Sequence, residues 1–386
     1  MQYRGVLLIA ILAALSVHCG SSDEEPATPA ADSGTDSAAT DGGAESSTPD
    51  GGQDGETPEA ATDGSPEAAP GDAAPEAAPD AEPEAGANVG VEWTVRYQND
   101  TAEIMTGINS VAYSSTLGLH VAVGVGGRML TSTDGITWTP LTPAPTTSEL
   151  KAVACSGPLF VAVGAWSMAM KPTLLTSTNG TSWTEQNPGN LPTGKVLNAL
   201  NAISYVNGKF FASNGGEILY STDGVAWTYR PDLTGQSLGP VFWSGSKYIA
   251  VGTYGVILIS PDGDAWAKPT TGSDLGYNLS GVAKIGSTLV ATGQANQVLV
   301  STDDGQNWTK ASTNELTTNL GAPVSIGSQL VLVGSSGLVQ TSPDGTNWTK
   351  QTSPATNNLN GVIWTGTRLV AYGYSGGMPG FIMTSP

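Results

Sequence analysis

The stretch STDDGQNW, Ser301 to Trp308, places two adjacent acids beside a glycine and a tryptophan. Paired acids next to a glycine suit a catalytic or metal-binding loop, but they also suit a tight turn. Five further stretches repeat the pattern: STDGITW ending at Trp138, STNGTSW at Trp183, STDGVAW at Trp227, SPDGDAW at Trp266 and SPDGTNW at Trp348. The stretch is therefore one copy of a repeat and not a single site.

The repeat has the length of one four-stranded unit. Successive motif tryptophans lie 39 to 45 residues apart. Within each unit, short runs rich in valine, threonine and aromatic residues alternate with glycine, asparagine and aspartate, which predicts four short strands joined by turns. We name these strands A to D, counted from the centre of the fold outward. The motif is then the hairpin between strands C and D.

The two ends of the domain carry the halves of a further copy. The chain stops at FIMTSP, Phe381 to Pro386, which is a strand C followed by the first two residues of the motif. NVGVEWTVRY, Asn88 to Tyr97, supplies a glycine, a tryptophan and a strand D. Joined together, these segments predict an all-β, seven-bladed β-propeller that closes when the N-terminal strand pairs with the C-terminal blade. Seven tryptophans then mark seven blades: Trp93, Trp138, Trp183, Trp227, Trp266, Trp308 and Trp348.

The motif resembles the Asp-box, or BNR repeat, written S-x-D-x-G-x-x-W, which Ser301, Asp303, Gly305 and Trp308 match in full. The other complete copies lack one residue between the acid and the glycine. Asp-box propellers occur in sialidases, sortilin-like receptors and photosystem II assembly factors, so the resemblance implies a fold and not a reaction. We interpret the extra Asp304 as a solvated turn residue. The side chains expected to shape the turns are those of Asp134, Asn179, Asp223, Asp262, Asp303 and Asp344.

The first residues predict export. Arg4 precedes an apolar run from Val6 to Val17 that is too short to span a bilayer comfortably, and Cys19 follows it. The arrangement resembles a bacterial lipoprotein signal, which implies lipidation of Cys19, although His18 stands where a small residue is expected. An ordinary secretory signal is the alternative. The predicted divisions are a signal peptide over 1–19, a linker over 20–88 and the propeller over 89–386.

The linker is acidic and carries no apolar pattern. Of the chain's 34 acidic residues, 18 lie between Gly20 and Asn88, where there is no lysine or arginine. Such a segment cannot bury enough apolar surface to fold, so we expect a disordered spacer. Its Ala-Pro-Glu-Asp composition is similar to that of stalks in surface lipoproteins of myxobacteria and their relatives. The expected location is the bacterial outer membrane or cell surface, with the periplasmic side as the alternative.

Few ionisable residues are available for catalysis. Sialidases hold a carboxylate with three arginines, but residues 89–386 contain four in all, Arg96, Arg128, Arg230 and Arg368, and their places in the repeat do not converge. No metal cluster, cofactor motif or basic stripe for nucleic acid is visible. Cys155 lies in an apolar stretch, where we expect a small buried residue without a disulfide. We therefore favour a non-enzyme, with a degenerate or unusual sialidase-like glycoside hydrolase as the alternative.

A binding face is expected opposite the hairpin motifs, where the B–C and D–A loops meet. An apolar, aromatic surface for an envelope protein or a glycan would be presented there by Trp166, Met168, Met170, Tyr254, Tyr374 and Met378. The alternative is that these side chains cover the ring's own interior. The sequence thus predicts a monomeric, membrane-tethered binding or scaffold module without a cofactor or metal.

Overall fold

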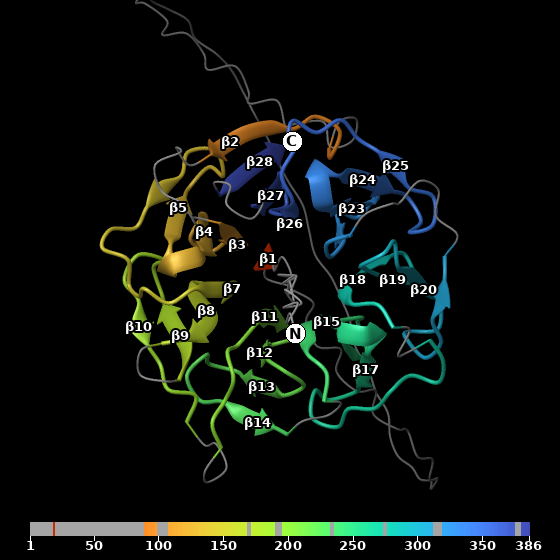
Figure 1. Cartoon of the computed structure of the whole chain (residues 1–386), viewed down its shortest axis with the longest axis horizontal. Coiled ribbons are helices and arrows are strands. Elements are labelled where there is room, and N and C mark those ends of the chain that lie inside the picture. The colour runs from red at the N-terminus through yellow and green to blue at the C-terminus, as the bar shows by residue number, and fades with distance from the viewer. Residues whose placement is uncertain are drawn as a thin grey trace, which may run out of the picture. The chain divides into compact units, whose positions relative to one another are not determined.

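The protein is a seven-bladed β-propeller, as the repeat predicts (Figure 1). The computed structural model describes residues 18–19, 89–98, 107–167, 171–189, 195–231, 235–272, 276–311, 319–374 and 380–386. Within these ranges the only helical elements are three short 3-10 turns: η1 (Val125–Gly127), η2 (Thr253–Gly255) and η3 (Ser335–Gly337). No helix in the described part of the chain has the length and apolar character needed to cross a membrane.

The first four blades follow the chain in order, and each is an antiparallel sheet that runs from an inner strand to an outer one. Blade 1 consists of β3 (Ile108–Ser114), β4 (Leu119–Gly124), β5 (Met129–Ser132) and β6 (Thr139–Pro140). Blade 2 consists of β7 (Leu150–Ser156), β8 (Leu159–Trp166), β9 (Pro172–Ser177) and β10 (Thr184–Glu185). Blade 3 consists of β11 (Ala202–Val206), β12 (Lys209–Ser213), β13 (Ile218–Ser221) and β14 (Thr228–Arg230). Blade 4 consists of β15 (Leu238–Trp243), β16 (Tyr248–Gly252), β17 (Ile257–Ser260) and the single bridge Ile259↔Ala267.

The last three blades complete the ring. Blade 5 consists of β18 (Leu279–Ile285), β19 (Thr288–Gly293), β20 (Val298–Ser301) and β21 (Thr309–Lys310). Blade 6 consists of β22 (Val324–Ser325), β23 (Leu330–Val333), β24 (Val339–Ser342) and β25 (Thr349–Lys350). Blade 7 consists of β26 (Leu359–Trp364), β27 (Leu369–Gly373), β28 (Phe381–Ser385) and β2 (Thr94–Gln98).

Closure occurs in blade 7, where the two ends of the domain meet. Strand β2 pairs antiparallel with β28, with Thr94 opposite Thr384. The Gly90 N–H donates to the Ser385 hydroxyl at 2.9 Å, and the Trp93 indole N–H donates to the Gly90 carbonyl at 2.9 Å. The predicted ring closure is therefore confirmed.

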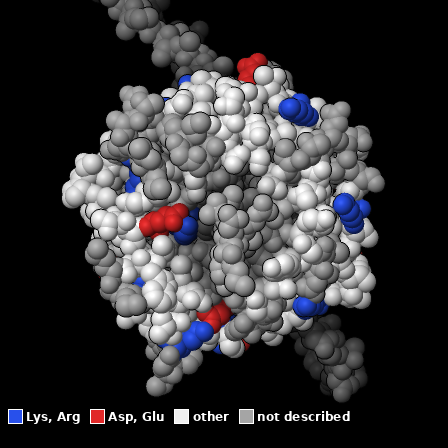
Figure 2. Space-filling model, viewed as in Figure 1, with Lys and Arg blue, Asp and Glu red and all other residues white. Residues whose placement is uncertain are grey.

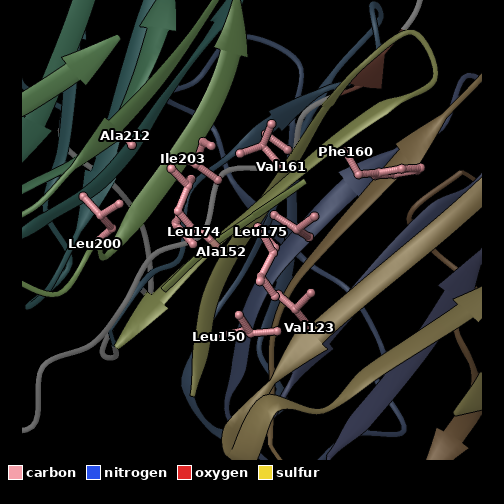
Figure 3. Close-up of a cluster of buried hydrophobic side chains, with 14 of the residues drawn as sticks. Val123, Leu150, Ala152, Phe160, Val161, Leu174, Leu175, Leu200, Ile203 and Ala212 are labelled. Atoms are coloured by element: carbon pink, nitrogen blue, oxygen red, sulfur yellow. The ribbon is translucent and has the colours of Figure 1, made fainter. Parts of the chain in front are cut away.

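Strand position within a blade determines burial. All five residues of β16 are buried, because a middle strand has neighbouring strands at both edges and a neighbouring blade on each face. The outer strand β21, by contrast, is exposed at both residues. Apolar side chains between blades form six clusters, and the largest joins blades 1 to 3 (Figure 3). In that cluster Val123, Leu150 and Phe160 belong to β4, β7 and β8.

One short element precedes the domain. Strand β1 (His18–Cys19) pairs in parallel with the innermost strand of blade 1, with the Cys19 backbone opposite Ser114. Cys155, on β7, is fully buried as expected. It is disulfide-bonded, however, so the expectation that it forms no disulfide is wrong. That expectation assumed that Cys19, the chain's other cysteine, is consumed by lipidation.

His120, in β4, is buried beneath the first hairpin motif. Its ring lies 4.4 Å from Tyr113 and 5.8 Å from Trp138, measured between ring centroids. Nδ1 lies 3.1 Å from the Ser132 carbonyl, which can only accept, so Nδ1 carries the proton of the neutral ring. Nε2 is buried with no hydrogen-bond partner. Burial lowers the pKa of His120 to about 4.

Replacing Trp308 tests how much the motif tryptophan contributes to the stability of the fold. Its side chain is 3% exposed, and its indole N–H donates to the Gly305 carbonyl at 3.0 Å. We expect Trp308→Ala to lower the free energy of unfolding by about 3–5 kcal/mol, measured by denaturant titration. Trp266 is only partly buried, so Trp266→Ala is the matched control and is expected to cost less. An unchanged midpoint for Trp308→Ala would contradict a structural role.

Acid should weaken the fold through His120. Its folded pKa lies below the ordinary value of 6.5, so the unfolded chain binds more protons between these two values. This contribution to stability is complete above about pH 6.5 and is lost as pH falls toward 4, to a total of about 3 kcal/mol. In His120→Gln the loss over that interval should be absent. Equal slopes in the two proteins, measured by urea denaturation from pH 7 to 4, would contradict this assignment.

Candidate functional site

The acids of the hairpin motifs turn their oxygens toward their own turns. Asp134 Oδ1 accepts the backbone N–H groups of Ile136 and Thr137 at 2.8 and 2.7 Å. The corresponding acids in the other motifs accept the equivalent pair of N–H groups, and Asn179 does the same with its amide oxygen. The acid oxygen also accepts the hydroxyl of the motif serine at 2.8–3.2 Å. These bonds use the carboxylates within the hairpin.

Hydrogen bonds keep these carboxylates ionised. The Asn307 side-chain amide, followed by the Asn307 backbone N–H and the Ser301 hydroxyl, lowers the pKa of Asp303 to about 2. The pKa values of Asp134, Asp223, Asp262 and Asp344 are also lowered. A general acid needs a raised pKa, so these residues are poorly suited to that task.

The motif tryptophans take the same position in every blade. Each indole N–H donates to the carbonyl of the motif glycine at 2.9–3.1 Å. Five of the rings are buried, whereas Trp183 and Trp266 are partly buried. The rings therefore cover the blade edges beneath the hairpins.

Asp304 does more than occupy a solvated turn, so that expectation is wrong. It holds a left-handed backbone with φ of 57°. Its carboxylate accepts the hydroxyl of Ser246 and lies 3.7 Å from Lys247 Nζ, and both of these residues belong to the A–B turn of blade 4. The inserted residue thus links blade 5 to the preceding blade.

The four arginines of the domain lie at separate places. Arg96 Nε donates to Thr384 Oγ1 and Arg128 donates to the Tyr97 hydroxyl. Arg230 forms an ion pair with Asp264. Arg368 donates to the Asp134 carbonyl at 2.8 Å. The three-arginine clamp of a sialidase is therefore not assembled from these residues. Across the described ranges no group of three or more His, Cys, Asp or Glu side chains is placed to hold a metal ion.

The opposite face presents isolated apolar side chains. Antiparallel blades put the B–C and D–A loops on one face and the hairpin motifs on the other. Trp166 is 40% exposed and Tyr254 is 63% exposed, both in B–C loops. Tyr374 is half-buried, and its ring lies against the Gly107 backbone, which matches the alternative that some of these residues cover the ring itself. Met168, Met170 and Met378 lie outside the described residues.

Two exposed residues of this face were not predicted from the sequence. Val196 is 59% exposed and Tyr277 is 48% exposed, and both lie in D–A loops. Charged side chains are few and separated on the face of the ring turned to the viewer in Figure 2. A signal was present for Tyr277, because an aromatic residue between Gly276 and Asn278 stands outside any strand pattern.

Tyr254 is held in an unusual backbone conformation. Its φ is 57°, a left-handed value that a non-glycine residue seldom adopts. Asn278 Oδ1 accepts the Tyr254 N–H at 3.0 Å, and Gly276 donates its N–H to the Tyr254 carbonyl at 2.9 Å. The D–A loop of blade 5 therefore fixes the backbone that carries this exposed ring.

Comparison with known proteins finds likeness in structure and not in sequence. No family model matches the chain, and no curated protein matches it. YCF48 from Cyanidioschyzon merolae is similar over 76% of this chain and 98% of its own, at 15% identity and a TM-score of 0.58. A structure of YCF48 bound to D1 peptide covers 76% of this chain and 96% of its own, at 17% identity and a TM-score of 0.59. The WD40 β-propeller domain of Doa1 covers 77% and 97%, at 10% identity and a TM-score of 0.56. At these identities the chain shares the propeller fold with these proteins.

Proposed function

We propose that the domain is a non-catalytic scaffold that binds a protein or peptide on the face of its B–C and D–A loops. The observation that carries the proposal is the placement of the exposed aromatic side chains. The face of the B–C and D–A loops exposes Trp166, Tyr254 and Tyr277, with Val196 beside them, whereas the large apolar residues exposed on the hairpin-motif face, Val91, Leu117 and Val225, are aliphatic. Exposed aromatic residues supply most of the binding energy in protein interfaces, and a rigid scaffold positions them at low entropic cost.

The ionisable groups favour binding over catalysis. The motif acids are hydrogen-bonded within their turns with lowered pKa values, and the arginines lie at four separate contacts. A propeller of similar fold, YCF48, has been captured with a D1 peptide, which supports a peptide ligand here. The regular hydrogen bonds of the hairpins support the proposal that they are Asp-boxes. A glycan on the same aromatic residues is the second candidate.

The binding face can be tested with a double variant. We expect Trp166→Ala/Tyr254→Ala to lower capture of the envelope partner by cross-linking at least tenfold, measured by quantitative mass spectrometry on the full chain. Val225→Ala is the matched control, because Val225 is 48% exposed but lies in a hairpin motif on the other face. Capture that is unchanged in the double variant would contradict the proposal. Hydrolysis of chromogenic glycosides by the wild-type chain would favour the glycosidase alternative.

We further propose that lipid on Cys19 tethers the domain to the outer membrane or cell surface through residues 20–88. The acidic, proline-rich composition supports an extended spacer, which could reach on the order of 200 Å at about 3 Å per residue. A lipid at Cys19 and a disulfide at Cys155 exclude each other within one chain, because the chain has two cysteines.

Replacing Cys19 separates these states. We expect Cys19→Ser to move the protein from the membrane fraction to the soluble fraction and to abolish labelling by an alkyne fatty acid, because the acceptor sulfur is gone. The labelling is read by in-gel fluorescence after click chemistry. A wild-type chain that takes up no fatty acid, and whose fractionation matches that of Cys19→Ser, would contradict the anchor.

A further inference from the structure

Glycine stands at or near the end of strand B in six of the seven blades for one physical reason. A Cβ at any of these glycines would lie closer than 3.0 Å to a backbone carbonyl oxygen of the same blade, which belongs to Asn319 in blade 6 and to the residue before strand A in the other five. No side chain fits at that distance. The six residues are Gly124, Gly164, Gly252, Gly293, Gly334 and Gly373.

Blade 3 carries Asn214 at this place. The Asn214 N–H donates to the Glu217 carbonyl, three residues on, at 3.2 Å, whereas the Gly124 N–H donates to the Arg128 carbonyl, four residues on, at 2.9 Å. The Asn214 carbonyl accepts the Leu238 N–H, the first residue of the next blade, at 3.3 Å. Asn214 therefore replaces the glycine without changing the connection between blades.

Blade 3 differs from five other blades at the start of strand A. In blades 1, 2, 4, 5 and 7 the register of strand A shifts just after its first residue. In blade 3, β11 pairs with β12 without a shift, from Ala202 opposite Ser213 to Val206 opposite Lys209.

The Asn214 side chain has no hydrogen-bond partner. Asn214 is fully buried, and neither its Oδ1 nor its Nδ2 has a hydrogen bond of normal geometry. Glu217, three residues later, is 4% exposed, and its Oε2 also has no partner. An unpartnered buried polar atom destabilises a fold, so three in one turn point to a role other than stability.

The other oxygen of Glu217 is fully used. Oε1 accepts the Tyr229 hydroxyl at 2.5 Å and forms an ion pair with Lys195 Nζ. Burial acts to raise the pKa of Glu217, but the bonds from Lys195 and Tyr229, together with the nearby Asn214 amide, outweigh it and lower that pKa. The carboxylate is therefore ionised, and Lys195 cancels its charge.

We propose that this turn binds the primary carboxamide of an asparagine or glutamine side chain on the protein partner. The inference rests on the proposed function and names the group recognised. A carboxamide offers one carbonyl and two N–H groups, which complement Asn214 Nδ2, Asn214 Oδ1 and Glu217 Oε2. A carboxylate ligand brings no donor and meets the charge of Glu217, and an ammonium brings no acceptor for Asn214 Nδ2. The cancelled charge of Glu217 and Lys195 also favours a neutral group.

The site lies close to the surface of the proposed binding face. Lys195, which covers Glu217, has a side chain that is 32% exposed, and its neighbour Val196 is 59% exposed. Trp166 and Tyr254 belong to the B–C loops of the two flanking blades, 2 and 4. A peptide crossing these apolar residues would pass over the turn from Asn214 to Glu217.

Blocked tripeptides test the proposal on the full chain. The probes are acetyl-Gly-Gln-Gly-methylamide, its Asn counterpart, and the Met and Glu counterparts as controls of similar size. We expect the Gln or the Asn probe to bind at least tenfold more tightly than the Met and Glu probes, measured by NMR titration of the Asn214 side-chain amide. Equal affinities for all four probes would overturn the proposal. A crystal structure that shows only an ordered water between Asn214 and Glu217, displaced by no probe, would also overturn it.

Two variants link binding to the named groups. Asn214→Gly introduces the residue of the other six blades, so it should fold with a Tm close to that of the wild type and lose the preference for the Gln or Asn probe. Glu217→Gln keeps the shape of the side chain and should weaken the preferred probe at least fivefold. Unchanged discrimination in both variants would overturn the proposal.

The outcomes separate this proposal from the proposed function. Partner capture that depends on Trp166 and Tyr254, with no discrimination among probes, overturns the carboxamide site and leaves the scaffold function standing. Probe binding that depends on Asn214, with capture unaffected by the Trp166/Tyr254 double variant, supports the carboxamide site and contradicts the placement of the scaffold's binding face.

Discussion

The hydrogen bond from the motif glycine N–H to the motif serine hydroxyl is the contact on which the ring depends. It measures 2.8–3.0 Å in every blade. In six blades it joins neighbours in sequence, but in blade 7 it joins Gly90 to Ser385, across almost the whole domain. An apolar cluster between two blades forms only when both blades are in place. The clusters on the two sides of blade 7 therefore depend on the bond between Gly90 and Ser385, which forms only in the folded chain.

A second set of contacts ties four of the hairpins to the blade before them. A polar side chain near the start of strand B reaches the backbone carbonyl of the residue before the glycine of the next motif. Lys209 reaches Asp262, Gln329 reaches Val89 and Arg368 reaches Asp134, at 2.8–2.9 Å, and Lys247 reaches Asp304 at 3.5 Å. These junctions hold the basic groups of Lys209, Lys247 and Arg368 between blades.

The sequence predicts the features that depend on local spacing and misses those that depend on contacts across blades. The blade number and the closure follow from the recurring motif and its divided copy, because each hairpin is a local structure. Asp304 looked solvated because its partners, Ser246 and Lys247, are about 57 residues away and no local pattern announces them. Cys155 was misjudged because Cys19, the chain's other cysteine, was assigned to the signal peptide. Tyr277 and Val196 escaped notice because D–A loops have no periodicity that separates exposed from buried positions.

Because the seven blades follow one pattern, a blade that departs from the pattern is informative. In six blades the backbone at the end of strand B leaves no space for a side chain, and a glycine occupies that position. Asn214 keeps the carbonyl bond to the next blade while adding a buried amide without a partner, so stability alone gives no reason for the change. Local rules are broken most often where a protein has acquired a function, and a ring of seven similar blades can relax one of them at little cost to the other six. The unpartnered amide and the neutralised Glu217 are two departures within one turn, and recognition of a neutral polar group accounts for both.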